Sequence, residues 1–466
     1  KRYSFCTLLG KISDLLRYFG MSRESKRFAG DAASLPKGVA APPLNPVTKE
    51  FEWGGPIGGA FMSASLPFVV LGLNSLCSST SCSLDNVMNI GSLMTAEVSN
   101  NLDNLPYALL LEIVWIMFHS LFYLAPIGKR VLGLPLRNGK VLSYNMNAIH
   151  AFVVCHVTAV VLHITGIFPL SFLADLFVPL MLGAIIISIV MSVLLYAASY
   201  RGSNVLLALG GNSGNACYDF WIGRELNPRI GDLDLKFMCE LRPGLIGWSL
   251  LNWAFVTRAY ENGVLTPAIV LVAIFESWYV ADGLFIEEGN LTMMDIVHDG
   301  FGFMLCFGDL AWVPFIYTLK CKFMAYHPQQ QSWLYLGLCV SMHILGYLIF
   351  RGANTEKDLF RKNPKDPRVQ HLNVMKTSAG KSLIISGYWG ICRHPNYVGD
   401  WLMTTSWSAL CGPLHILPYF QSVYFAILLI HRQLRDEHQM QLKYGNEDWN
   451  RFCGIVKHRL IPYVYQ

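Results

Sequence analysis

Cationic, flat aromatic and amide side chains recur in three short segments of the last third of the chain, at residues 357–361, 386–400 and 431–449. Arg and Lys side chains bind phosphates, Trp and Tyr rings stack on other flat rings, and Asn and Asp bind hydroxyl or amide groups. This combination suits an anionic nucleotide. It also fits a basic belt on anionic lipid, although such a belt does not need Gly, Asn and Trp at fixed positions.

Ionisable residues within apolar stretches form a second set with chemical potential. A charged group in hydrocarbon is costly, so it marks a functional site or a buried pair. These residues are Glu112, Glu276, Asp282, Asp309 and Asp436. His156 and His163 lie seven residues apart on one helix face, but no carboxylate or third histidine accompanies them. We therefore expect hydrogen bonds at these histidines, and no metal site.

The elements that position these residues must lie largely in a membrane. Of the 466 residues, 53% are hydrophobic and only 14% are charged, whereas soluble chains carry roughly 25% charged residues. The composition predicts an all-α polytopic membrane protein. A spanning helix needs about 20 mostly apolar residues. About ten such segments are expected, near residues 57–77, 106–127, 147–169, 176–199, 244–260, 264–281, 300–319, 332–350, 399–413 and 415–431.

The distribution of charge predicts the orientation. Residues 1–50 form a basic tail, and the loops after the second and before the ninth expected span are also basic, whereas residues 80–105 contain no Lys or Arg. This pattern favours cytosolic or nucleoplasmic termini. The acidic segment 282–299, and Lys320 with Lys322, fit that orientation poorly. The twelve cysteines are scattered, but Cys77 and Cys82 lie in a segment assigned to the lumen and could pair.

Ordered motifs across residues 51–466 resemble the sterol reductase family, which includes delta-14 sterol reductases, delta-7 sterol reductases and the membrane domain of the lamin B receptor. The motifs are Gly54-Gly55-Pro56, residues 219–229, Arg242-Pro243-Gly244, residues 299–303, Gly308-Asp309-Leu310 and the three C-terminal segments. His394-Pro395-Asn396-Tyr397 is similar to the delta-14 branch, since delta-7 reductases tend to carry Phe at the position of Pro395. Tyr388 and the segment Lys457-His458-Arg459 depart from that branch.

The resemblance implies a ten-helix fold with a C-terminal half, residues 244–466, that binds NADPH and a sterol. Residues 51–243 would supply the N-terminal helices and a cytosolic loop. By matching, the cofactor contacts are Lys357, Arg361, Ile384, Trp389, Asn396, Tyr397, Asp436, Lys443 and Tyr444. Positive charge adds Arg393, Arg432 and Arg435. The catalytic tyrosine of the family falls on Tyr279 and its essential aspartate on Asp436, with Asp282 and Glu287 as supporting candidates.

The expected function is that of a delta-14 sterol reductase, which uses NADPH to reduce the 14,15 double bond of sterol 8,14-dienes. The expected partners are a sterol from the bilayer and membrane lipid, with no nucleic acid. The expected location is the endoplasmic reticulum membrane or the inner nuclear membrane. One alternative is a protein like the lamin B receptor, with weak or no reductase activity and with nuclear-envelope partners if a region precedes Lys1.

A remoter alternative is a membrane methyltransferase that uses S-adenosylmethionine. It is suggested by Arg393-His394-Pro395 and by Arg435-Asp436-Glu437. The six N-terminal spans and Asn227-Pro228-Arg229 do not fit that class.

Overall fold

The computed structural model describes residues 43–202, 204–378 and 380–465. Residues 1–42 of the expected basic tail lie outside this part. The chain divides into two compact units. The N-terminal unit is Ala41–Gln330 with Cys411–Pro418, and the C-terminal unit is Gln331–Leu410 with Tyr419–Gln466. The boundary predicted at residue 243 concerns where cofactor and sterol bind, and it stays a prediction.

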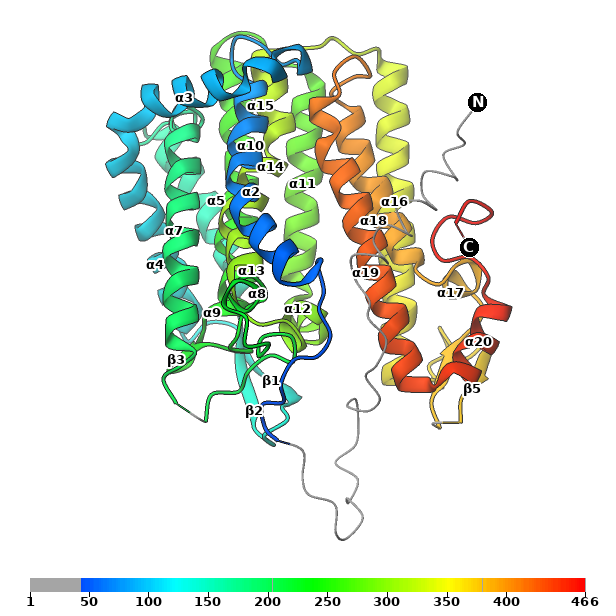
Figure 1. Cartoon of the computed structure of the whole chain (residues 1–466). Coiled ribbons are helices and arrows are strands. Elements are labelled where there is room, and N and C mark those ends of the chain that lie inside the picture. The colour runs from blue at the N-terminus through cyan, green and yellow to red at the C-terminus, as the bar shows by residue number, and fades with distance from the viewer. Residues whose placement is uncertain (1–42, 203, 379, 466) are drawn as a thin grey trace. The chain divides into compact units, whose positions relative to one another are not determined.

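The N-terminal unit is mostly helical (Figure 1). Its long helices are α2 (Gly55–Leu76), α3 (Ile90–Asn101), α4 (Leu105–Leu124), α5 (Ala148–Ile164), α7 (Phe177–Ala198), α10 (Pro243–Glu261) and α11 (Pro267–Phe285). Its short helices are α6 (Phe172–Asp175), α8 (Ala216–Ile222), α9 (Leu235–Leu241), α12 (Met294–Val297), α13 (Phe303–Phe307), α14 (Val313–Tyr317) and α15 (Leu319–Tyr326). A π-helical turn, Gly308–Trp312, joins α13 to α14. The unit also contains two antiparallel pairs, β1 (Lys129–Pro135) with β2 (Val141–Met146) and β3 (Arg229–Ile230) with β4 (Leu233–Asp234). Three 3-10 helices, Leu84–Asn89, Leu102–Asn104 and Glu287–Thr292, complete it.

The C-terminal unit is built on three long helices, α16 (Trp333–Lys362), α18 (Pro395–Ala409) and α19 (Phe420–Tyr444). The antiparallel pair β5 (Val374–Lys376) and β6 (Ser382–Ile384), the short helix α17 (Tyr388–Ile391) and α20 (Asn446–Ile455) complete it. Glycines let α16 and α18 approach closely. A Cβ atom added to Gly399 would lie 2.6 Å from the carbonyl oxygen of Gly346 and 2.5 Å from the amide nitrogen of Phe350. The two backbones are therefore in direct contact, as small residues allow between membrane helices.

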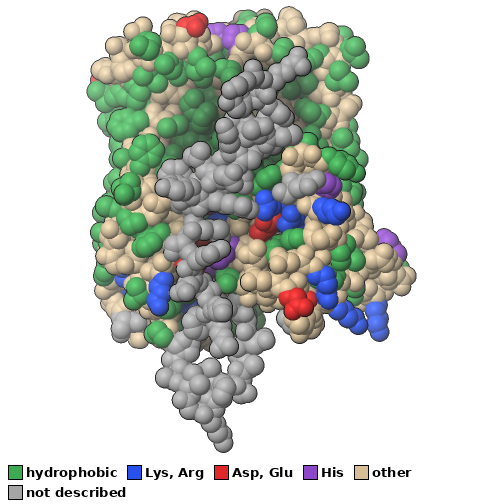
Figure 2. All heavy atoms as spheres, turned by 45° about the vertical axis from the view of Figure 1, so that its right-hand side comes forward, with side chains coloured by type: hydrophobic (Ala, Val, Ile, Leu, Met, Phe, Trp, Pro, Cys, Tyr) green, Lys and Arg blue, Asp and Glu red, His purple; other side chains and the backbone are tan. Residues whose placement is uncertain are grey.

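Within the described residues, six helices are long and apolar enough to span a membrane. They are Gly55–Leu76, Leu84–Leu124, Phe177–Ala198, Pro267–Phe285, Phe303–Tyr326 and Trp333–Lys362. A mostly helical membrane protein is thus confirmed. The other four expected segments overlap α5, α10, α18 and α19, so the count of ten stays a prediction. On the face drawn in Figure 2, most visible Lys and Arg side chains gather in the lower half, below a mainly hydrophobic region.

Three buried cations inside the N-terminal unit have polar partners. Lys320 contacts Glu276 at 2.8 Å, and the two side chains are 1% and 0% exposed. Lys322 donates to the carbonyl oxygen of Asn74 at 3.0 Å. Arg242 contacts Glu287 at 2.6 Å in another buried pair. Lys320 and Lys322 therefore belong to the interior of the span Phe303–Tyr326 and carry no information about which side a loop faces.

The described end of the expected tail is held in place. Asn45 donates to the carbonyl oxygen of Val205 at 2.8 Å, and Thr48 donates to that of Leu209 at 2.7 Å. Cys77 and Cys82, which the sequence analysis assigns to the lumen as a possible pair, form a disulfide. Both features belong to the N-terminal unit.

Candidate active site

A short hydrogen bond links the first turn of α18 to the last third of α19. The hydroxyl of Tyr397 donates to Oδ2 of Asp436 at 2.6 Å. Burial, and then the charge of Asp436, raise the pKa of Tyr397 well above its usual range. The phenol therefore stays protonated and keeps one carboxylate oxygen of Asp436 oriented.

The imidazole of His394 stacks on the ring of Tyr397, with centroids 4.9 Å apart and planes 10° apart. Burial, and then the positive charges of Lys357, Arg393 and Arg459, lower the pKa of His394 to about 3. The ring is therefore neutral at physiological pH. Its Nε2 atom is buried, and no hydrogen-bond partner is present in residues 43–202, 204–378 or 380–465.

Helix α16 supplies a cation and two anchoring groups to the same region. The Nζ atom of Lys357 lies 3.9 Å from the ring centre of Trp389, which is buried. The indole of Trp389 donates to the carbonyl oxygen of Ala353 at 2.9 Å. The carboxylate of Glu356 accepts from the amide of Tyr388 at 3.1 Å. These contacts hold α17 against α16, so Trp389 presents a fixed ring beneath the ammonium group.

Only one of the two polar atoms of the Asn396 side-chain amide has a hydrogen-bond partner within the described part of the chain. Its Nδ2 atom donates to Oδ1 of Asn354 at 3.3 Å, whereas its own Oδ1 is buried and has no partner within the described part of the chain. Buried polar atoms are normally hydrogen-bonded to protein, water or ligand. The unpartnered atoms of Asn396 and His394, with Lys357 and Trp389 nearby, fit a dinucleotide that carries phosphates, hydroxyls and flat rings.

Arg393 is engaged within the protein. Its Nη1 donates to Oε1 of Glu437 at 2.6 Å and to Sγ of Cys453 at 3.0 Å. Its Nη2 donates to the carbonyl oxygen of Lys457 at 3.1 Å. Arg459 donates to the same oxygen of Glu437 at 3.2 Å. Arg393 thus ties α18 to α19 and to the segment after α20, and its predicted cofactor contact stays a prediction.

The remaining predicted cofactor residues also belong to the C-terminal unit. Arg361 and Lys443 are exposed near the C-terminal ends of α16 and α19, and Arg432 and Arg435 are half-buried on α19. Ile384 ends β6 and pairs with Val374. Tyr444 packs on the cluster of Met375, Trp449, Phe452 and Val456, and Lys443 lies 5.2 Å from its ring centre.

Tyr279 belongs to the N-terminal unit, where it is half-buried on α11. Its ring meets that of Trp248 edge-on, with centroids 6.3 Å apart. The indole of Trp248 donates to Oε2 of Glu276 at 2.8 Å, and Asn252 donates to the same oxygen at 2.6 Å. Since Glu276 also pairs with Lys320, one wall of the Tyr279 environment is fixed by a buried ion pair. Glu287, a supporting candidate, is engaged with Arg242.

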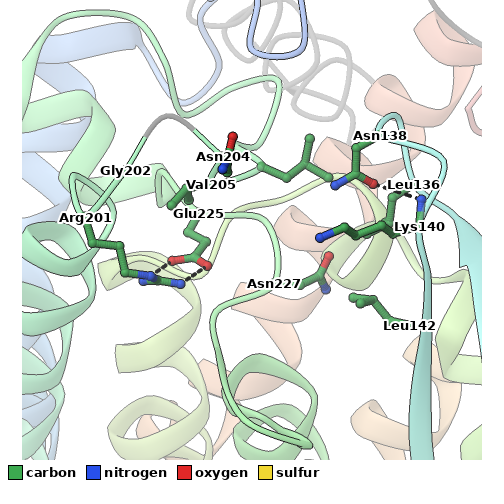
Figure 3. A pocket seen from close by; sticks show the side chains of 11 residues that line it. Leu136, Asn138, Lys140, Leu142, Arg201, Gly202, Asn204, Val205, Glu225 and Asn227 are labelled. Atoms are coloured by element: carbon green, nitrogen blue, oxygen red, sulfur yellow. Dashed lines mark hydrogen bonds and ion pairs between the residues drawn. The ribbon is translucent and has the colours of Figure 1, made fainter.

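A cavity of about 500 Å³ also lies in the N-terminal unit, between the β1–β2 turn and the segment after α7 (Figure 3). Arg201 and Glu225 form a bidentate pair in its wall, with contacts of 2.8 and 2.6 Å. Lys140 and Asn227 lie on the other side. The lining residues, all in the described part, include none of the predicted catalytic or cofactor residues.

Sequence reasoning missed the partners that orient the site. The sequence marks His394 only as part of a motif, and it does not distinguish Asn354, Glu356 or Glu437 as site residues. The Arg-His-Pro motif was the available signal for His394. The other contacts join residues 32 to 44 positions apart, and no local spacing indicates them.

Comparison with known proteins identifies the family. A model of the ergosterol biosynthesis ERG4/ERG24 family matches residues 47–465. Delta(14)-sterol reductase TM7SF2 of Mus musculus is 44% identical over 419 residues, which is 89% of this chain and 97% of that protein. Delta(14)-sterol reductase LBR of Gallus gallus is 43% identical over 421 residues, 90% of this chain and 64% of that protein. Delta(14)-sterol reductase erg24 of Schizosaccharomyces pombe is 40% identical over 424 residues, which is 89% of this chain and 97% of that protein. The chain therefore belongs to the ERG4/ERG24 family of sterol reductases, as its motifs indicated.

Proposed function

We propose that the chain is a delta-14 sterol reductase that uses NADPH to reduce the 14,15 double bond of sterol 8,14-dienes in the endoplasmic reticulum membrane. The observation that carries the proposal is that relatives 35–44% identical to the chain are named Delta(14)-sterol reductase. The unpartnered polar atoms around Tyr397 and Asp436 support a bound dinucleotide.

Residues of the C-terminal unit would hold the cofactor. Lys357 and Trp389 offer a cation over a flat ring, and Asn396 offers a buried acceptor. Arg361 and Lys443 are exposed cations that suit the additional phosphate by which NADPH differs from NADH. When bound, NADPH supplies a hydride.

The residues of the chain would supply the proton. An alkene does not accept hydride readily, so an acid must protonate the substrate first or at the same time, which leaves positive charge at carbon 14. We assign this role to Tyr279. A general acid typically contributes about 10²- to 10⁴-fold. Asp436 is the proposed essential carboxylate, and the hydrogen bond from Tyr397 keeps its oxygen oriented.

Expression of the chain in cells that lack delta-14 reductase, followed by sterol profiling, tests the proposal. The 8,14-diene should disappear with the wild-type chain and persist with Tyr279→Phe or Asp436→Ala. Matched controls are Tyr260→Phe and Asp358→Ala, at exposed positions of the two units, and both should restore the sterol profile. Persistence of the diene with folded wild-type protein in the membrane would overturn the proposal.

A second candidate is a nuclear-envelope protein with weak or no reductase activity. The 43% identity to chicken LBR favours it, although that protein also bears the name Delta(14)-sterol reductase. The same sterol profile separates the two candidates. The family match over residues 47–465 favours either of them over a methyltransferase.

A further inference from the structure

His394 carries a buried polar atom that the protein leaves unsatisfied. The residue immediately precedes α18, and its backbone amide donates to the carbonyl oxygen of Arg459 at 3.2 Å. Its ring is fixed by the stack on Tyr397. Its Nε2 is buried without a partner in the described part of the chain. Because an unpaired buried polar atom costs stability, a ligand or a water molecule should complete this site.

The charge state limits which ligand group fits. Burial, and then the nearby cations, lower the pKa of His394 to about 3, so its ring is neutral. A neutral imidazole presents either an N–H or a lone pair at Nε2, depending on its tautomer. A hydroxyl both donates and accepts, so it satisfies either tautomer. The ligand group that fits best is therefore a hydroxyl.

The neighbours of His394 indicate which part of the cofactor this hydroxyl belongs to. His394 contacts Tyr397, and Tyr397 donates to Asp436. The proposed function, on which this inference rests, makes Asp436 the essential carboxylate of the reaction. A group beside this chain of contacts lies near the reacting end of the cofactor, which is the nicotinamide end.

We propose that His394 is a cofactor-binding residue whose Nε2 forms a hydrogen bond with a hydroxyl of the nicotinamide ribose, while its ring positions Tyr397. This role differs from that of the neighbouring cations, which interact with phosphates. It predicts an effect on binding of the whole dinucleotide and none on binding of its adenosine half.

Equilibrium binding to the purified full chain, without sterol, tests the inference. The probes are NADPH and 2′,5′-ADP, which keeps the adenosine phosphates and lacks the nicotinamide half. His394→Phe keeps a flat ring against Tyr397 and removes Nε2. Loss of one neutral hydrogen bond should raise the Kd for NADPH roughly 2- to 12-fold and leave the Kd for 2′,5′-ADP unchanged. The matched control is His371→Phe, at an exposed position of the same unit. This substitution should change neither the Kd for NADPH nor the Kd for 2′,5′-ADP.

The outcomes separate this inference from the proposed function. An unchanged Kd for NADPH in His394→Phe would overturn the role of His394 while leaving the function intact. An equal rise in the Kd of His394→Phe for NADPH and for 2′,5′-ADP would overturn the assignment of His394 to the nicotinamide end of the cofactor. Failure of the wild-type chain to bind NADPH would count against the proposed function instead. If His394→Phe does not fold, His394→Gln and His394→Leu compare side chains with and without a hydrogen-bonding end, and equal affinities would refute the inference.

Discussion

Removal of Glu437 should destabilise the C-terminal unit strongly. Its carboxylate contacts Arg393 at 2.6 Å and Arg459 at 3.2 Å, and the side chains of Arg393 and Glu437 are 7% and 8% exposed. Glu437→Ala leaves two guanidinium groups without their shared carboxylate. Loss of one partner of a buried ion pair costs about 3–5 kcal/mol. At about 2–4 °C per kcal/mol, the Tm should fall by roughly 6 to 20 °C.

Thermal unfolding of the purified chain in detergent measures this effect. The matched control is Asp358→Ala, which breaks the pair with Lys362 on the surface of α16, where the side chains are 56% and 72% exposed. An exposed pair contributes at most about 1 kcal/mol, so the control should shift the Tm little. If Glu437→Ala lowers the Tm no further than the control does, the carboxylate does not stabilise the two arginines and the reasoning is refuted.

Three further predictions concern the packing and titration of this unit. Tyr397→Phe removes the hydroxyl that donates to Asp436. Because a hydrogen bond to a charged group contributes about 1.5–3 kcal/mol, sterol turnover should fall roughly 10- to 150-fold. An unchanged rate in a microsomal assay would contradict the role of this bond. Gly399→Ala places a methyl group 2.5 Å from the amide nitrogen of Phe350. Because overpacking costs about 1–3 kcal/mol, the Tm should fall. An unchanged Tm would show that α16 and α18 can move apart without loss of stability. The pKa of His394 is depressed to about 3 in the folded chain, so its contribution to stability is complete above its ordinary pKa of about 6.5 and is lost as the pH falls from there toward 3. Urea unfolding at several pH values should therefore show that the free energy of unfolding falls less steeply with acid in His394→Phe than in the wild-type chain. Parallel curves for the two proteins would argue against burial of a neutral ring.

The hydrophobic segments predicted the membrane helices well where apolar residues run without interruption. The segment expected at 176–199 is α7, Phe177–Ala198. The segment expected at 332–350 is also helical, but α16 continues to Lys362. Its last three turns are polar, and a search for apolar runs does not detect a helix that continues beyond the hydrocarbon. This polar extension carries Lys357 and Arg361, so it supplies part of the candidate site.

The candidate site could be predicted only in part. Its cations and aromatic rings are visible in the sequence, because residue type alone indicates their chemistry. Their partners depend on how distant helices pack. The charge of Arg393 predicts a cofactor contact, but it does not indicate that the guanidinium contacts Glu437. Likewise, Lys320 and Lys322 contradict the expected orientation only if they lie in a loop. Their burial inside a spanning segment removes that conflict.

The glycine contact between α16 and α18 limits how the C-terminal unit can move. Two helices whose backbones touch at Gly346 and Gly399 cannot slide or rotate past each other without a steric clash. Lys357 on one helix and Asn396 on the other should therefore keep a constant separation throughout turnover, with Asn354 bridging to Asn396. If the proposed dinucleotide needs the protein to open in order to bind or leave, that opening must come from elements other than this pair of helices.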